Sequence, residues 1–196
     1  MRNIFLSAIL SVITLFAFAT KPNTDNIRVN TEKSTVKWIG SKISENHEGT
    51  INIAKGYLGI EHGTLVSGQV VIDMKSIHTT DMSDKKNQRL DGHLKSKDFF
   101  NVEEFSVATI IIKEAIRGEG NSYQIGAELT IKGITNKIRF EADVDVNGVK
   151  FLATAKIKID RTKWDIKYGS GSFFEDLGDK LILDEIEFDI TLVSVK

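Results

Sequence analysis

The sequence contains no cysteine and a single proline among its 196 residues. The absence of cysteine excludes disulfides, iron–sulfur clusters and zinc sites built from thiolates, and it excludes a lipid anchor on an N-terminal cysteine. Without such cross-links, the chain must obtain its stability from a sizeable hydrophobic core. One proline against 15 glycines indicates regular elements joined by glycine turns.

The chain also lacks an excess of charge of either sign. It has 26 lysines and arginines against 27 aspartates and glutamates, so the formal net charge is −1. A nucleic-acid-binding protein carries a basic surplus gathered on one face, and we therefore expect no nucleic-acid partner. The hydrophobic share of 41% is ordinary for a globular protein, and the length fits one domain or at most two small ones.

The N-terminus has the pattern of an export signal. Arg2 is followed by an apolar run over residues 4–19 that ends in Ala17-Phe18-Ala19, an A-x-A cleavage site. The run is shorter than the roughly 20 apolar residues of a membrane-spanning helix. We expect a signal peptide over residues 1–19, cleavage after Ala19, a single domain over residues 20–196, and a periplasmic or secreted protein without stable membrane insertion. An uncleaved N-terminal anchor is the alternative.

Apolar and polar residues alternate with a period of two over most of the remaining chain. Between residues 123 and 131 the odd positions are apolar and the even positions are mostly polar. This pattern is typical of antiparallel strands with one buried face, and no long helical segment separates the strands as a parallel sheet would require. Strands are expected at 35–40, 50–60, 65–74, 107–115, 123–131, 138–146, 149–159 and 182–192.

One turn and one insert interrupt the alternation. Asn147-Gly148 predicts a type I′ hairpin turn, after which Val149 is the first buried residue of the next strand. Residues 76–102 form the irregular insert. Because Leu90 and Leu94 lie four positions apart in its polar part, we expect one or two short helices over residues 84–96.

The expected fold class is all-β, with about eight long antiparallel strands that close into an up-and-down barrel or divide into a sandwich. An eight-stranded barrel has an interior that side chains fill or that one small ligand occupies. Composition does not determine packing density, so a solid core and a cavity both stay open on this pattern. The inward positions combine small residues with aromatic ones, namely Ala127, Ala142, Ala153 and Ala155 with Phe140, Phe151 and Phe188.

Patterns that signal catalysis or metal binding are missing from the sequence. There is no H-E-x-x-H, and residues 169–172 (GSGS) do not form the nucleophile elbow G-x-S-x-G. His78 with Asp81, or Asp91 with His93, is a possible metal pair, but histidines near carboxylates in loops are common by chance. We therefore predict neither a metal site nor a catalytic residue.

Asp184 lies in the apolar phase of the last expected strand. A buried carboxylate needs a partner, which Arg161 or Lys163 offers. We prefer a position at the barrel rim, where the phase of the strand no longer matters.

Five segments, in order along the chain, resemble the YceI family of exported lipid-binding proteins. The clearest is 93–102 (HLKSKDFFNV), which is similar to that family's H-L-K-S-x-D-F-F-D-V signature. The chain departs from the family pattern at Lys97, Asn101, Phe105, Ser106 and Ile110. The resemblance covers about residues 30–195, and its other segments are 34–40 (STVKWIG) with 47–49 (HEG), 72–77 (IDMKSI) with Asp81, 129–135 (LTIKGIT) and 159–166 (IDRTKWDI).

This resemblance implies a lipocalin-like barrel that holds a long isoprenoid or other lipid tail, which favours the cavity. The function we expect is non-catalytic binding, sequestration or transport of a polyisoprenoid, an isoprenoid quinone or a fatty-acid derivative, with no cofactor except the bound lipid. The apolar wall is expected to include Trp38, Leu129, Phe140, Phe151, Ile157, Trp164, Phe188, Phe99 and Phe100, and the headgroup contacts to include His93, Lys95 and Arg161.

Two other functions stay open. The first is a structural or interaction module with a filled barrel, whose outer face binds a protein. The second, less favoured, is a lipid-modifying enzyme with His93 as general base. The chain is expected to be a monomer or a homodimer.

Overall fold

The computed structural model describes residues 24–195, so the expected signal peptide and its cleavage site lie outside the described residues. These described residues form nine strands, one α-helix and two short 3₁₀-helices. In order they are β1 (Asp25–Arg28), β2 (Thr35–Lys42), β3 (Asn46–Glu61), β4 (Thr64–Thr79), α1 (Asp84–Lys95), β5 (Val107–Arg117), β6 (Ser122–Ile131), β7 (Ile134–Asn147), β8 (Lys150–Asp160), η1 (Arg161–Trp164), η2 (Gly178–Lys180) and β9 (Ile182–Val193).

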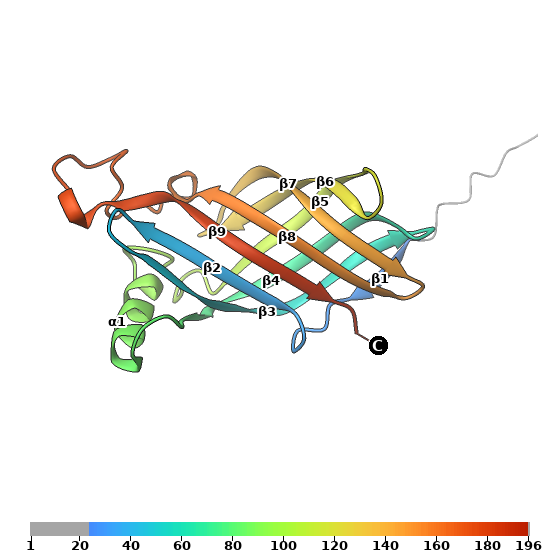
Figure 1. Ribbon diagram of the computed structural model, residues 1–196, viewed down its shortest axis with the longest axis horizontal. Coiled ribbons are helices and arrows are strands. Elements are labelled where there is room, and N and C mark those ends of the chain that lie inside the picture. Colours follow the sequence, from blue (N-terminus) through green and yellow to red (C-terminus); the bar gives the residue numbers. More distant parts are fainter. Residues whose placement is uncertain (1–23, 196) are drawn as a thin grey trace, which may run out of the picture.

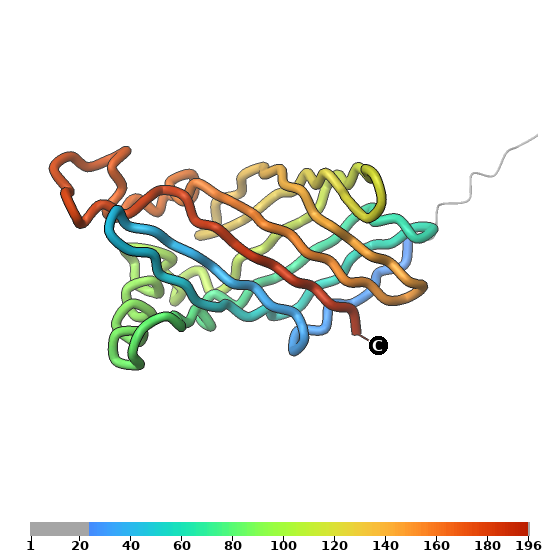
Figure 2. The backbone as a smooth tube through the Cα atoms, viewed as in Figure 1, coloured from blue at the N-terminus to red at the C-terminus, as the bar shows by residue number. Residues whose placement is uncertain are grey.

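Strands β2 to β9 form a closed antiparallel barrel in up-and-down order (Figures 1 and 2). Each strand pairs with the next along the chain, and β9 pairs with β2 to close the ring. β1 pairs with residues 57–60 of β3, and β2 pairs with an earlier part of β3. Both strands therefore lie along the same side of β3, one after the other. The predicted up-and-down barrel is confirmed, and the sandwich alternative is wrong.

The strand phases follow the alternation in the sequence because each strand has one face toward the barrel interior. In β6, Tyr123, Ile125 and Ala127 are buried, whereas Gln124 between them is exposed.

The prediction that Val149 is the first buried residue of the next strand was wrong. Asn147 pairs with Lys150, so Gly148 and Val149 are the two central residues of the hairpin, and Val149 is 69% exposed. Gly148 has φ +60°, which at the first central position fits a type II′ turn.

The predicted helix forms as a single element, α1, at one end of the barrel (Figure 1). The segment between β8 and β9, residues 161–181, lies at the same end and is called the β8–β9 segment below. At the start of α1, the side chain of Asn87 accepts a hydrogen bond from the amide of Met82 and donates one to its carbonyl, each at 3.1 Å. Within residues 24–195 no helix has both the length and the apolar character needed to cross a bilayer.

Asp91 attaches α1 to the end of β4. Its Oδ1 accepts hydrogen bonds from the amide (2.7 Å) and the hydroxyl (2.6 Å) of the fully buried Thr79. Its Oδ2 lies 2.9 Å from Nδ1 of His78. Burial alone would raise the pKa of Asp91, but the hydrogen bonds from Thr79 and His78 outweigh it and lower the pKa below the usual 3.8. The folded protein therefore favours the ionised carboxylate.

The attachment of α1 is expected to weaken in acid. Because the pKa of Asp91 is lower in the folded state, its contribution is fully present above pH 3.8 and is lost as the pH falls through the folded value. Unfolding free energies measured between about pH 6 and pH 3 should fall more steeply for the wild type than for Asp91→Asn. Asp98→Asn, an exposed carboxylate just beyond the helix, is the control. Parallel profiles for the wild type and Asp91→Asn would contradict this account.

Candidate functional site

The barrel encloses a cavity of about 770 Å³. This volume lies within the range of roughly 300–1,000 Å³ that small-molecule sites occupy. The sequence left open whether the barrel has a solid core or a cavity, and a volume of this size identifies a cavity. The filled-barrel interpretation is therefore wrong for this molecule.

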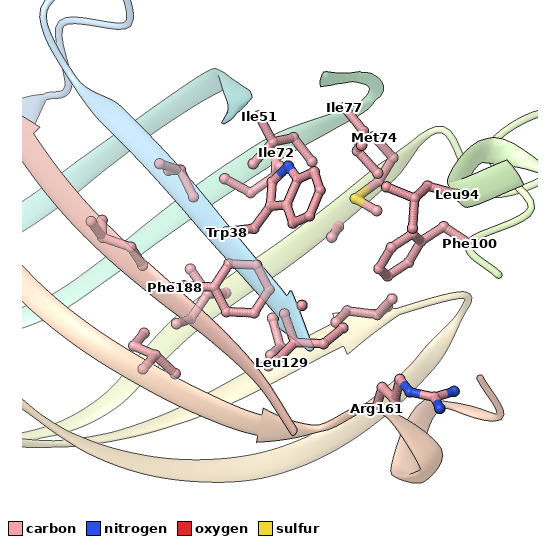
Figure 3. A pocket seen from close by; sticks show the side chains of 18 of the residues that line it. Trp38, Ile51, Ile72, Met74, Ile77, Leu94, Phe100, Leu129, Arg161 and Phe188 are labelled. Carbon is pink, nitrogen blue, oxygen red and sulfur yellow. The ribbon is translucent and has the colours of Figure 1, made fainter. Parts of the chain in front are cut away.

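Trp38 and Phe188 form one part of the cavity wall. They are direct cross-strand partners on β2 and β9, and Figure 3 shows both rings directed into the same space. On the other side of Trp38, Gly49 of β3 is its register partner. A Cβ at Gly49 would lie 2.6 Å from the Trp38 ring, so the missing side chain gives the indole its place in the wall.

Small side chains keep the neighbouring part of the wall, on β7 and β8, thin. Ala142 on β7 and Ala155 on β8 are direct partners, and both line the cavity with Ala153. Facing alanines contribute only methyl groups to the lumen, which leaves the volume that bulkier residues would occupy. Ala127, the fourth small residue of the predicted inward phase, is buried but is not among the lining residues.

One end of the cavity, called the closed end below, is sealed by buried apolar residues. Leu58, Leu65 and Ile125 line it, and each is at most 2% exposed. Behind them the hydroxyl of Tyr123 accepts a hydrogen bond of 3.3 Å from the amide of Leu65. An apolar chain that enters the barrel must therefore stop at this end.

The other end, called the mouth below, is bordered by α1 and the β8–β9 segment. Leu94 of α1 and Phe100, just after it, reach the cavity from this side (Figure 3). All the charged residues that line the cavity lie at this end. They are Lys42, Glu45, His47, Lys86, Arg89, His93, Arg161, Asp179 and Lys180.

Aromatic contacts join the two parts of the mouth. The His93 ring packs edge-on against Tyr168 of the β8–β9 segment at 4.6 Å between centroids, and against Phe99 at 5.2 Å. Arg161 places its guanidinium carbon 5.6 Å from the centre of the Phe99 ring. His93, the general base in the enzyme interpretation, therefore lies between aromatic rings.

Arg161 is 1% exposed, and its guanidinium serves the β8–β9 segment. It donates hydrogen bonds to three backbone carbonyls, those of Ile166 (2.6 Å), Ile182 (3.0 Å) and Leu183 (3.1 Å). Burial lowers the pKa of Arg161, and the carboxylate of Asp184, 3.3 Å from Nη2, opposes that shift. Both expectations for Asp184 are therefore met. It lies near the rim of the barrel, with its side chain 24% exposed, and it also pairs with Arg161.

The structure brings most of the residues named from the sequence to one cavity. Phe151, Trp164 and Lys95 are not among the lining residues. Phe151 is buried near the closed end, and Trp164 is buried in η1, where its Nε1 donates to the carbonyl of Leu129 at 3.1 Å. Those that line the cavity are Trp38, Leu129, Phe140, Ile157, Phe188, Phe99, Phe100, His93 and Arg161.

Two mouth residues, Lys86 and Arg89, were missed by the sequence analysis. The signal for them was present, because positions 86, 89 and 93 share one face of a helix. Their basic side chains were read as part of a generally polar insert.

The structure does not form the histidine–carboxylate pairs considered in the sequence, His78 with Asp81 and His93 with Asp91. His78 pairs with Asp91 and His47 with Asp81, each at 2.9 Å. Both pairs link the strands to the segment that carries α1. Among residues 24–195 no three histidine, cysteine or acidic side chains gather in a way that would hold a metal ion.

Comparison with known proteins places this barrel in a family. A family model described as a YceI-like domain matches residues 27–194. BcnA of Burkholderia cenocepacia has a similar structure, with a TM-score of 0.70 and 23% identity over 85% of this chain and 99% of that chain. A polyisoprenoid binding domain from Saccharophagus degradans, implicated in plant cell wall breakdown, has a TM-score of 0.62 and 16% identity over 87% of this chain and 98% of that chain.

A relative of closer sequence covers only part of the chain. A UPF0312 protein of Staphylococcus aureus (strain USA300) is 44% identical over 64 residues, and the match spans 33% of this chain and 33% of the relative. The two structural neighbours are less than 25% identical and support the fold alone. The family model, in contrast, spans the whole barrel from β1 to the end of β9, and the chain therefore belongs to the family of YceI-like domain proteins.

Proposed function

We propose that this protein binds, sequesters or transports a long-chain lipid without chemically changing it. The observation that carries the proposal is the apolar cavity of about 770 Å³, sealed at one end and bordered by charged residues at the other. An amphiphile with one long tail fits this arrangement. The ligand class is a polyisoprenoid, an isoprenoid quinone or a fatty-acid derivative, and a relative of this fold is a polyisoprenoid binding domain.

The hydrophobic effect supplies the affinity in this mechanism. Each methylene that leaves water for the cavity contributes about 0.8 kcal/mol, and the ordering of the tail takes back part of that gain. The aromatic and aliphatic walls are expected to contact the tail. His93 and Arg161 stay candidates for headgroup contacts at the mouth, although the guanidinium of Arg161 is already occupied by three carbonyls. Lys95 stays a prediction from the sequence.

The purified protein is expected to carry its ligand. Extraction with organic solvent followed by mass spectrometry should yield a long-chain lipid from the native protein and none from a denatured and delipidated sample. Mass spectrometry of the exported protein should also show the loss of residues 1–19, in agreement with the proposed periplasmic or secreted location. A protein that is repeatedly free of lipid and also ignores added quinones, prenols and fatty acids would disprove the proposal.

Affinity is expected to rise with tail length until the cavity is full. The lining positions of β9 run from Ile182 to Leu192, which at about 3.3 Å per residue and a tilt of about 40° corresponds to roughly 25 Å. In a series of saturated fatty acids, each added methylene should tighten binding by up to roughly four-fold until the tail spans this depth. Titration calorimetry at concentrations below micelle formation measures the series. A flat series would show that the tail stays outside the barrel.

A further inference from the structure

Helix α1 turns a basic face toward the mouth. Lys86 and Arg89 are three positions apart on one face of the helix, and both line the cavity together with the apolar Leu90. The acidic Asp91 of the same helix is directed to β4, where Thr79 and His78 occupy its oxygens. The helix thus directs two of its cations, Lys86 and Arg89, toward the opening and its buried carboxylate, Asp91, toward the barrel wall.

These cations have no counterpart in the described part of the chain. Of the cations that line the mouth, Lys42 has Glu45 at 3.2 Å and Arg161 has Asp184 at 3.3 Å. Within residues 24–195 no carboxylate lies within 4.0 Å of the charged groups of Lys86, Arg89 or Lys180. Among the described residues, Glu45 pairs with Lys42 and Asp179 is the one lining carboxylate without such a pair, so three cations face one anion.

An amphiphile in the barrel must leave its headgroup at this position. A charged headgroup cannot follow the tail into the apolar tube, because an unpaired charge is strongly disfavoured there. Beside the low-dielectric wall its attraction to the basic side chains is stronger than in bulk water. An anionic head would gain this attraction, a cationic head would be repelled, and a neutral head would gain little.

We propose that the mouth selects amphiphiles whose headgroup is an anion, a phosphate or a carboxylate, and that Lys86 and Arg89 hold this anion with Lys180 of the β8–β9 segment. The inference rests on the proposed function, since it assumes that a tail occupies the barrel. It adds the class of headgroup and the residues that select it.

The test compares ligands that share one tail and differ in the head. Hexadecyl phosphate, hexadecanol and hexadecylamine are titrated into the delipidated protein at neutral pH. The wild type is expected to bind hexadecyl phosphate about 10- to 100-fold more tightly than hexadecanol, as one to two charge-assisted hydrogen bonds would give, and to bind hexadecylamine most weakly. The preference should decrease as salt is added.

Two double variants test which residues cause the preference for an anionic headgroup. Lys86→Gln with Arg89→Gln should lose most of the preference, measured as the ratio of the affinities for hexadecyl phosphate and hexadecanol. Lys85→Gln with Lys97→Gln removes the same charge from exposed positions that do not line the cavity, and it should keep the preference. Circular dichroism and thermal unfolding confirm that both double variants fold.

Each outcome separates this inference from the proposed function. Equal binding of the phosphate and the alcohol by the wild type, or a preference that survives loss of Lys86 and Arg89, would overturn the anion site and leave the carrier intact. Failure to bind any of the three amphiphiles would overturn the carrier itself. Inorganic phosphate at millimolar concentration should not displace hexadecyl phosphate, and displacement would assign the mouth to a free anion instead of a lipid head.

Discussion

Replacing Ala155 with tryptophan is expected to lower the affinity for a long-chain lipid by at least about 100-fold while the barrel stays folded. Ala155 lines the cavity on β8, directly opposite Ala142 on β7. An indole at this position would occupy space that belongs to the tail. If it displaces about four methylenes, roughly 3 kcal/mol of binding free energy is lost, which corresponds to roughly 200-fold.

The matched control is Leu152→Trp on the same strand. Leu152 is 48% exposed on the outer face of the barrel, so a tryptophan there adds the same ring without entering the lumen. Its affinity should equal that of the wild type, and thermal unfolding should show that both variants are folded. Normal binding by a folded Ala155→Trp protein would place the ligand elsewhere.

Loss of Arg161 is expected to cause the largest decrease in stability. Arg161→Met removes the donors for the carbonyls of Ile166, Ile182 and Leu183, and it leaves Asp184 without its cation. Removing one partner from a buried charged network typically costs about 3–5 kcal/mol. Denaturant unfolding should therefore show a loss of this order, and the β8–β9 segment should become more accessible to proteases.

Two further substitutions test the role of the guanidinium itself. Arg161→Lys keeps the charge but cannot supply the planar fork of donors, so its stability should lie between those of the wild type and Arg161→Met. Lys163→Met changes an exposed neighbour and should alter the unfolding free energy by no more than about 0.5 kcal/mol. Wild-type stability in Arg161→Met would show that these hydrogen bonds do not hold the segment.

The strands and the helix were predictable because their signals are local. Alternation along 123–131 reflects a face of β6 that is buried at Tyr123, Ile125, Ala127 and Ile131 and partly buried at Leu129. The spacing of Leu90 and Leu94 reflects one face of α1. The prediction that Val149 is buried also failed for a local reason. A two-residue turn exists near Asn147-Gly148, but its central pair is displaced by one position. Gly148 is compatible with both registers, because type I′ accepts Asn-Gly at its centre and type II′ accepts Gly at its first central position.

The cavity was not predictable at the same level. Whether Ala142 and Ala155 leave open space depends on what lies across the barrel, and that is set by the closure of β2 on β9. Trp164 was predicted to line the wall, but it is buried in η1 outside the cavity lining, and its indole donates a hydrogen bond to the backbone of Leu129. The partners of Arg161 are backbone carbonyls as many as 22 positions away, which carry no side-chain signature in the sequence.

β1 and the end of β9 bring both termini of the described chain to the same place. Asp25 pairs with Ile60 beside the hairpin that joins β3 to β4, and the amide of Val195 donates to the carbonyl of Arg28 at 2.9 Å. Both lie away from α1, at the sealed end of the barrel (Figure 1). A protein immobilised on a sensor chip through a C-terminal tag would therefore present its entrance to the flowing solution, and kinetic measurements made there would record passage through that entrance without obstruction by the support.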